Sequence, residues 1–124
     1  MTIEISGKDK KGPVQLSMEI ENQFASPGTW LKGNFHCHVR CMGDPEEVCA
    51  HYRKLGFRIL CSTDYRDVTP MPESTELFVT LTGAEISGFG DAHIVCVGVE
   101  KAPRPGESGI ESLTDLIAEV EAQG

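Results

Sequence analysis

Residues 31–62 follow the order of an apolar strand, a strongly capped helix and a second apolar strand. Asp44 stands at a helix N-cap position, Pro45 at the first helical position and two glutamates in the first turn, while Gly56 marks the end of the helix. Phe57–Ser62 is short and apolar, which is typical of a strand buried on both faces. Because two strands joined by a helix usually lie parallel, the sequence predicts a βαβ unit and an α/β fold.

Further elements extend this pattern toward the C-terminus. We expect strands at Leu77–Leu81 and Ala92–Val99, with a glycine-interrupted segment between them. Ser108 and Glu111 resemble a capping box and predict a closing helix. Its apolar stripe consists of Ile110, Leu113, Leu116, Ile117 and Val120.

The N-terminal part of the chain has a different pattern. Residues 14–22 alternate apolar and polar side chains, which predicts a half-buried strand. We therefore expect an N-terminal strand extension at residues 1–29. Residues 30–124 are expected to form a mostly parallel domain with its helices on the outside.

Composition excludes several functional classes. The net charge of −8 disfavours nucleic acid as a partner, because phosphate binding needs a basic surface. No apolar run approaches the ~20 residues of a membrane span, and the N-terminus lacks the apolar core of a secretory signal. The five cysteines are an odd set without a Cys-x-x-Cys motif, which favours reduced thiols. We therefore expect a cytoplasmic protein without a membrane partner.

Two histidines follow the first strand of the βαβ unit. Because alternate side chains of an extended strand project to the same face, His36 and His38 can converge on one point. Two neutral imidazole nitrogens are suitable ligands for one metal ion. The same pattern also fits a polar rim in which both side chains make only hydrogen bonds.

Carboxylates and a further histidine stand at the ends of the neighbouring strands. Asp64 and Glu85 each follow a predicted strand, and His93 opens the last one. Since the carboxyl ends of parallel strands meet at one rim, these carboxylates are expected near the two histidines. A carboxylate such as Glu85 can bridge two metal ions, an arrangement that suits hydrolysis of phosphate esters. Asp64 also fits a turn-capping role, and His93 also fits a hydrogen-bonded histidine of the core.

Several motifs occur together in a specific order. Five stretches of the sequence are residues 30–38 (WLKGNFHCH), 44–48 (DPEEV), 60–64 (LCSTD), 82–85 (TGAE) and 92–98 (AHIVCVG). In this order they resemble the successive motifs of the polymerase and histidinol phosphatase (PHP) family. The resemblance implies a distorted (β/α)₇ barrel that binds up to three metal ions and hydrolyses phosphoesters through a metal-activated water. It also implies that His36, His38 and Glu85 are metal ligands, with His93 holding a second ion beside Glu85.

The chain departs from the family pattern at three places. Tyr65 stands where the second motif normally has a metal-binding histidine, and a phenol is a poor neutral ligand beside imidazoles. Residues 40–44 replace the usual Ser-Asp-Gly, so that Asp44 is either a shifted ligand or only a helix cap. The strand that carries the family's Ala-His-Pro is expected where the sequence stops at Gly124. We therefore expect the first half of a barrel, with fewer than three ions of zinc, manganese or iron.

These observations lead to two hypotheses. The first is a PHP-type metal-dependent phosphoesterase acting on a phosphorylated small molecule, with Arg40 and Arg66 reaching a substrate phosphate. The alternative is a catalytically incomplete domain that binds metal or associates with itself. An open sheet edge needs cover, so we expect a homo-oligomer or a missing C-terminal half. The sequence leaves the catalytic residues, the substrate and the identity of the metal open.

Overall fold

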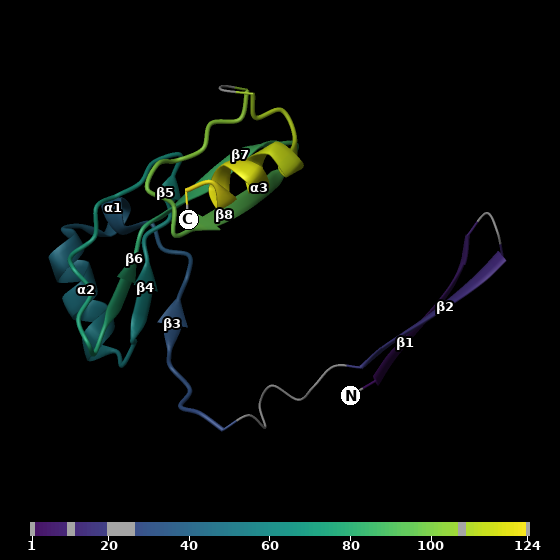
Figure 1. Ribbon diagram of the computed structural model, residues 1–124. Coiled ribbons are helices and arrows are strands. Elements are labelled where there is room, and N and C mark those ends of the chain that lie inside the picture. The colour runs from purple at the N-terminus through teal and green to yellow at the C-terminus, as the bar shows by residue number, and fades with distance from the viewer. Residues whose placement is uncertain (1, 10–11, 20–26, 107–108, 124) are drawn as a thin grey trace. The chain divides into compact units, whose positions relative to one another are not determined.

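In a computed structural model of the protein, residues 2–9, 12–19, 27–106 and 109–123 are described. The chain divides into two compact units, residues 1–30 and residues 31–124. The first unit contains an antiparallel hairpin of β1 (Thr2–Asp9) and β2 (Gly12–Glu19) (Figure 1). The strand predicted at residues 14–22 therefore lies partly in β2, and its last three residues fall outside the described part.

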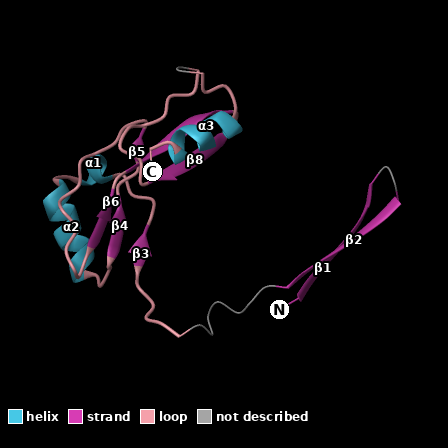
Figure 2. Cartoon of the chain, in the orientation of Figure 1, coloured by secondary structure: helices cyan, strands magenta, loops and turns pink. Residues whose placement is uncertain are grey.

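The second unit begins with a parallel three-stranded sheet in the order β3-β4-β6. Its strands are β3 (Gly33–Asn34), β4 (Ile59–Cys61) and β6 (Val79–Leu81). Two helices, α1 (Val39–Met42) and α2 (Pro45–Lys54), connect β3 to β4 (Figure 2). The predicted βαβ unit is confirmed, since β3 and β4 are parallel and α2 lies between them in the chain. Asp44 caps α2 by accepting the backbone N–H groups of Glu46 and Glu47.

A second sheet has the order β5-β7-β8. It consists of β5 (Asp64–Tyr65), β7 (Gly83–Phe89) and β8 (Ala92–Val97), and α3 (Leu113–Glu121) follows in the chain. β5 and β7 are parallel, whereas β7 and β8 are antiparallel. The strands of the second unit are therefore mostly parallel, as expected, with β8 as the antiparallel exception. Only Gly90 and Asp91 separate the paired residues Phe89 and Ala92, and so short a connection can form only a hairpin.

The main chain crosses from the first sheet to the second at two neighbouring places. Ser62 and Thr63 separate β4 from β5, and Thr82 alone separates β6 from β7. At the second crossing a Cβ on Gly83 would lie 2.5 Å from the carbonyl oxygen of Cys96 in β8. Such a contact is too short for any side chain, so the crossing requires glycine. It carries β7, and with it Glu85, away from the first sheet.

Two apolar clusters support the two sheets. The first packs α2 against β4 and consists of Cys37, Val39, Val48, Cys49, Leu60 and Phe78. The second packs α3 against β7 and β8 and consists of Ala84, Ile86, Cys96, Val99, Ala102, Ile110 and Leu116. All five cysteines are free, as the composition predicted, and burial raises the pKa of the Cys61 thiol to about 11.

Two sequence-based expectations about packing need correction. The capping box is formed by Ser112 and Asp115, so the closing helix begins at Leu113; the predicted cap Ser108 lies outside the described residues. Leu113 and Ile117, members of the predicted apolar stripe, are each half exposed because only one side of α3 contacts the sheet.

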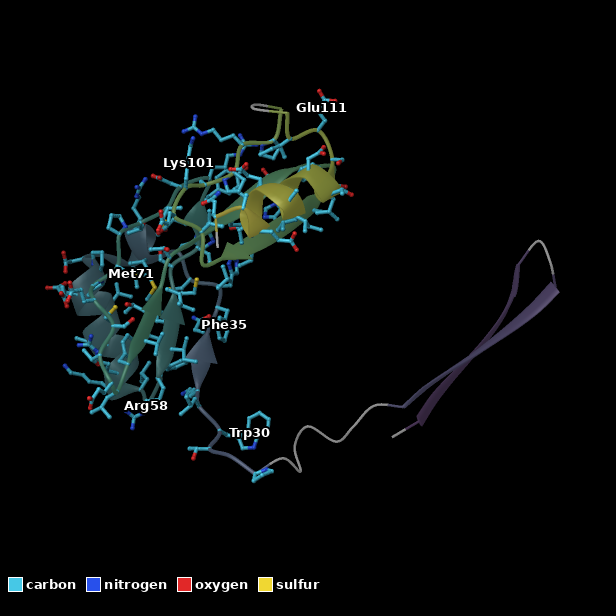
Figure 3. All side chains as sticks on the ribbon, in the orientation of Figure 1. Trp30, Phe35, Arg58, Met71, Lys101 and Glu111 are labelled. Carbon is cyan, nitrogen blue, oxygen red and sulfur yellow. The ribbon has the colours of Figure 1, made fainter. Side chains whose placement is uncertain are left out.

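Figure 3 labels Trp30 and Phe35, whose rings are also exposed. Within the described segments, no helix has the length and apolar character that a membrane crossing requires.

Candidate metal centre

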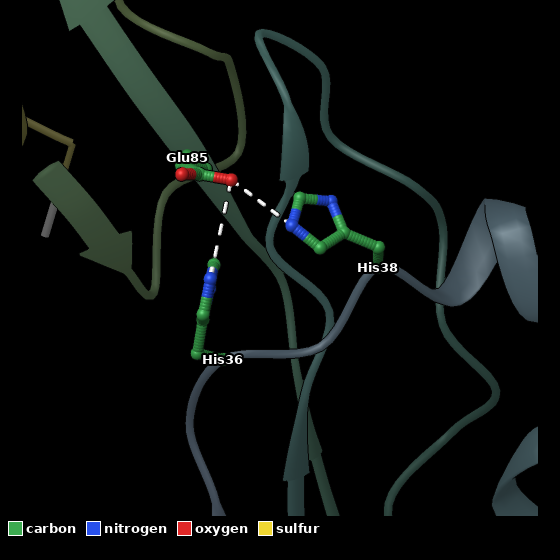
Figure 4. A group of neighbouring side chains, drawn as sticks. All are labelled: His36, His38 and Glu85. Carbon is green, nitrogen blue, oxygen red and sulfur yellow. Dashed lines mark ion pairs between the residues drawn. The ribbon is translucent and has the colours of Figure 1, made fainter. Parts of the chain in front are cut away.

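Three side chains of the second unit converge on one point. The ligand atoms of His36, His38 and Glu85 all lie within 4.8 Å of one another. Nε2 of His38 is 3.0 Å from Oε2 of Glu85, and Nε2 of His36 is 4.0 Å from the same oxygen. Figure 4 shows both imidazoles directed at this oxygen from one stretch of main chain, while the Glu85 side chain extends toward them from β7. The structure thus brings together the three residues that the resemblance implied as ligands.

The two histidines lie in an extended loop after β3 rather than in the strand itself. Their directions still alternate with their neighbours, since Cys37 between them is buried in the first apolar cluster. The backbone N–H of His36 donates to Oδ1 of Asn34, and His38 occupies the N-cap position of the short helix α1 without a side-chain capping hydrogen bond. Local main-chain geometry therefore exposes both imidazoles on the same side, as the i, i+2 spacing predicted.

Glu85 is the buried member of the group, with 6% of its surface exposed. A carboxylate at such a position needs partners, because desolvation penalises its charged form. Nδ1 of His93 lies 2.5 Å from Oε1 of Glu85. The hydrogen bond with His93 lowers the pKa of Glu85, burial opposes this shift, and the charges of His36, His93 and His38 add to the lowering. The carboxylate therefore stays ionised. Its Oε2 faces His36 and His38, and its Oε1 faces His93.

The antiparallel hairpin explains how His93 reaches this carboxylate. His93 is directly opposite Ser87, which is two residues from Glu85 on the same face of β7. Diagonal neighbours across two strands are within reach of long side chains. The prediction for His93, at the start of its strand, required a strand that enters from the same side as the other site residues. The antiparallel β8 enters from that side.

The donor set fits a divalent transition metal. Two imidazole nitrogens and one carboxylate oxygen are common ligands of zinc, manganese and iron. Two atoms that are each about 2.1 Å from one ion are at most about 4.2 Å apart. Both nitrogen–oxygen distances satisfy this limit, and all three ligand atoms lie within 4.8 Å of one another. The imidazoles of His36 and His38 are 48% and 38% exposed, so solvent and small molecules can approach. The site can therefore hold an ion and leave part of its coordination open.

The two aspartates predicted as ligands lie outside this group. The carboxylate of Asp64 is buried and accepts hydrogen bonds from the backbone N–H of Arg40 and from the hydroxyls of Ser62 and Thr69. It thereby holds the start of α1, two residues after His38. Asp44 is occupied as the cap of α2. In both cases backbone or hydroxyl donors already use the carboxylate, so the structure assigns these residues positioning roles.

Tyr65 lies beside the centre without entering it. Its hydroxyl is 2.5 Å from Oγ of Ser87, and its ring centroid is 6.4 Å from that of His93. Of the two arginines predicted to bind substrate, Arg40 pairs with Asp67 at 2.5 Å, whereas Nη2 of Arg66 donates to Ser87. The two arginines therefore have different partners.

Thr63 is a site residue that sequence reasoning did not identify. Its Oγ1 is 2.9 Å from Nδ1 of His36 and accepts the backbone N–H of Cys37 at 3.0 Å. A partner on Nδ1 fixes the orientation of the ring and leaves Nε2 directed at Glu85. The only sequence signal for this role is the position of Thr63 directly before Asp64 in the second motif.

Replacing Thr63 with valine should weaken metal binding about 10- to 100-fold, because His36 loses the group that orients it. The affinity for Zn²⁺ or Mn²⁺ can be measured by competition with a chromophoric chelator. Thr80→Val is the matched control: its hydroxyl donates to the carbonyl of Pro72, away from the centre. An unchanged affinity in Thr63→Val would show that the threonine does not position His36.

Comparison with protein-family models, with curated proteins and with solved structures finds no match for this chain.

Proposed function

We propose that this chain is a metal-dependent phosphoesterase domain of the PHP type, built on the first half of such a barrel. The observation that carries the proposal is the buried Glu85 carboxylate, which faces two histidines with one oxygen and a third histidine with the other. The order of the sequence motifs supports the same assignment. The parallel-rich sheets, with the site residues near the junction of the two sheets, are compatible with it.

His36, His38 and Glu85 would hold the first ion. A divalent ion supplies activation of a water molecule and stabilisation of negative charge on a phosphoryl group. The chain contributes the remaining functions: Thr63 orients His36, Asp64 fixes the loop after His38, and His93 keeps Glu85 ionised. The side of Glu85 that faces His93 would hold a second ion if one binds. This proposal does not require Tyr65 as a ligand.

Hydrolysis of p-nitrophenyl phosphate by metal-free protein reloaded with Mn²⁺, Zn²⁺ or Fe²⁺ tests the proposal. We expect metal-dependent activity that falls at least about 100-fold in His38→Ala, because one ligand is lost. His51→Ala is the control, since His51 is exposed on α2, away from the centre. Activity that is equal in His38→Ala and the parent chain would contradict the proposal. Stoichiometric metal binding without hydrolysis of this ester or of bis(p-nitrophenyl) phosphate would favour a metal-binding module.

A further inference from the structure

Arg66 differs from Arg40 in its electrostatic surroundings. The charge of Arg40 is paired with Asp67. Arg66 instead donates from Nη2 to the carbonyl and the hydroxyl of Ser87, each at 3.3 Å. Among the described residues, no ion pair joins Arg66 to a carboxylate. Its guanidinium is therefore held by neutral oxygen acceptors of β7.

The backbone holds Arg66 in a fixed position. Its φ of 54° lies in the left-handed region, which residues other than glycine rarely adopt. Its N–H donates to the carbonyl of Glu85 at 2.8 Å, which extends the pairing of β5 with β7 by one residue. The unfavourable conformation therefore directs an arginine side chain along β7 toward Ser87. This arrangement fixes where the charge lies.

A small pocket lies next to this guanidinium. Its volume is about 190 Å³, and it is lined by Arg66, Pro103, Arg104 and Pro105. The prolines restrict the backbone on both sides of Arg104. Pro105 packs closely over Gly88 of β7, where a Cβ would lie 3.0 Å from the proline ring. The pocket is thus lined by two arginines and two prolines, and its volume equals that of roughly six water molecules.

The pocket is close to the candidate metal centre. Ser87, which accepts from Arg66, is two residues from Glu85 on β7, a separation of about 7 Å along the strand. Both side chains are on the face that His93 also occupies. β7 therefore links the residues of the metal centre to the side chain that contacts Arg66.

We infer that the pocket formed by Arg66, Pro103, Arg104 and Pro105 binds a compact oxyanion, either a phosphate or a carboxylate. Two guanidinium groups provide planar sets of donors that match such an anion. Resting on the proposed function, the inference also defines the substrate class: a small phosphoester with a second anionic group remote from the bond that is hydrolysed. The metal centre receives the first group and the arginine pocket the second.

Anion binding to metal-free ¹⁵N-labelled protein tests the pocket independently of catalysis. Inorganic phosphate and acetate are titrated separately at constant ionic strength, while the arginine Nε–H signals are followed by NMR. We expect saturable shifts of the signals of Arg66 and Arg104, and an affinity at least about tenfold lower in Arg66→Gln and Arg104→Gln. Arg58→Gln removes the same charge from a residue that donates to Leu77, outside the pocket, and should bind like the parent chain.

Tighter binding of phosphate identifies a substrate with two phosphate groups, and tighter binding of acetate identifies a carboxylate as the second group. Shifts that do not saturate, or an equal loss of affinity in Arg58→Gln, would contradict anion binding by the pocket. Saturable binding together with the absence of hydrolysis would support anion binding by the pocket and contradict the proposed function. The two inferences therefore fail separately.

Discussion

Protein purified without chelators should contain about one divalent ion per chain, and His36→Ala and His38→Ala should each lose it. Each variant removes one of three ligands, and even the loss of a group that only supports a ligand costs 10- to 100-fold in affinity. We therefore expect a loss of at least about 100-fold. Plasma mass spectrometry gives the stoichiometry, and chelator competition gives the affinity.

The design of this experiment separates ligand loss from unfolding. Both imidazoles are substantially exposed, so their removal leaves no cavity in the core. Glu85→Gln tests the same ion with a side chain of similar shape, because it removes the charge that two histidines face. His51→Ala provides the control for loss of a histidine elsewhere. A parent chain that is folded but does not bind Zn²⁺ or Mn²⁺ would rule out a metal centre at this position.

Gly83→Ala should destabilise the second unit by about 3 kcal/mol, near the upper end of the usual cost of overpacking. The added Cβ would lie 2.5 Å from the carbonyl oxygen of Cys96 and 3.0 Å from both Sγ of Cys61 and the carbonyl oxygen of Ser62. Two of these atoms belong to the main chain and cannot rotate away. The midpoint of urea unfolding, followed by circular dichroism, measures the change.

Gly33→Ala is the matched control, since Gly33 also lies in a strand and its nearest atom belongs to the exposed ring of Phe35. That ring can rotate, so we expect a change below about 1 kcal/mol. Gly83 is also two residues from Glu85, so a shift of β7 should weaken metal binding at the same time. Equal stability of Gly83→Ala and the parent chain would show that the crossing between the sheets tolerates a side chain.

The sequence by itself determined the start of α2 and the direction of the two histidines. Asp44 and Pro45 specify the start of α2 because a cap and a first-turn proline act on adjacent backbone groups. The i, i+2 spacing of His36 and His38 exposes both rings on one side, with the buried Cys37 between them. These features depend on residues close together in the chain, so their patterns could be interpreted without knowledge of the fold.

Only the tertiary structure decided which distant groups meet. The hairpin between β7 and β8 brings His93 to Glu85. Hydrogen bonds from other elements give Asp64 a positioning role. Asp67 pairs with Arg40, whereas Arg66 lies beside a pocket. Each outcome depends on contacts between residues far apart in sequence or on the competition of several donors for one carboxylate, and local patterns carry no information about either.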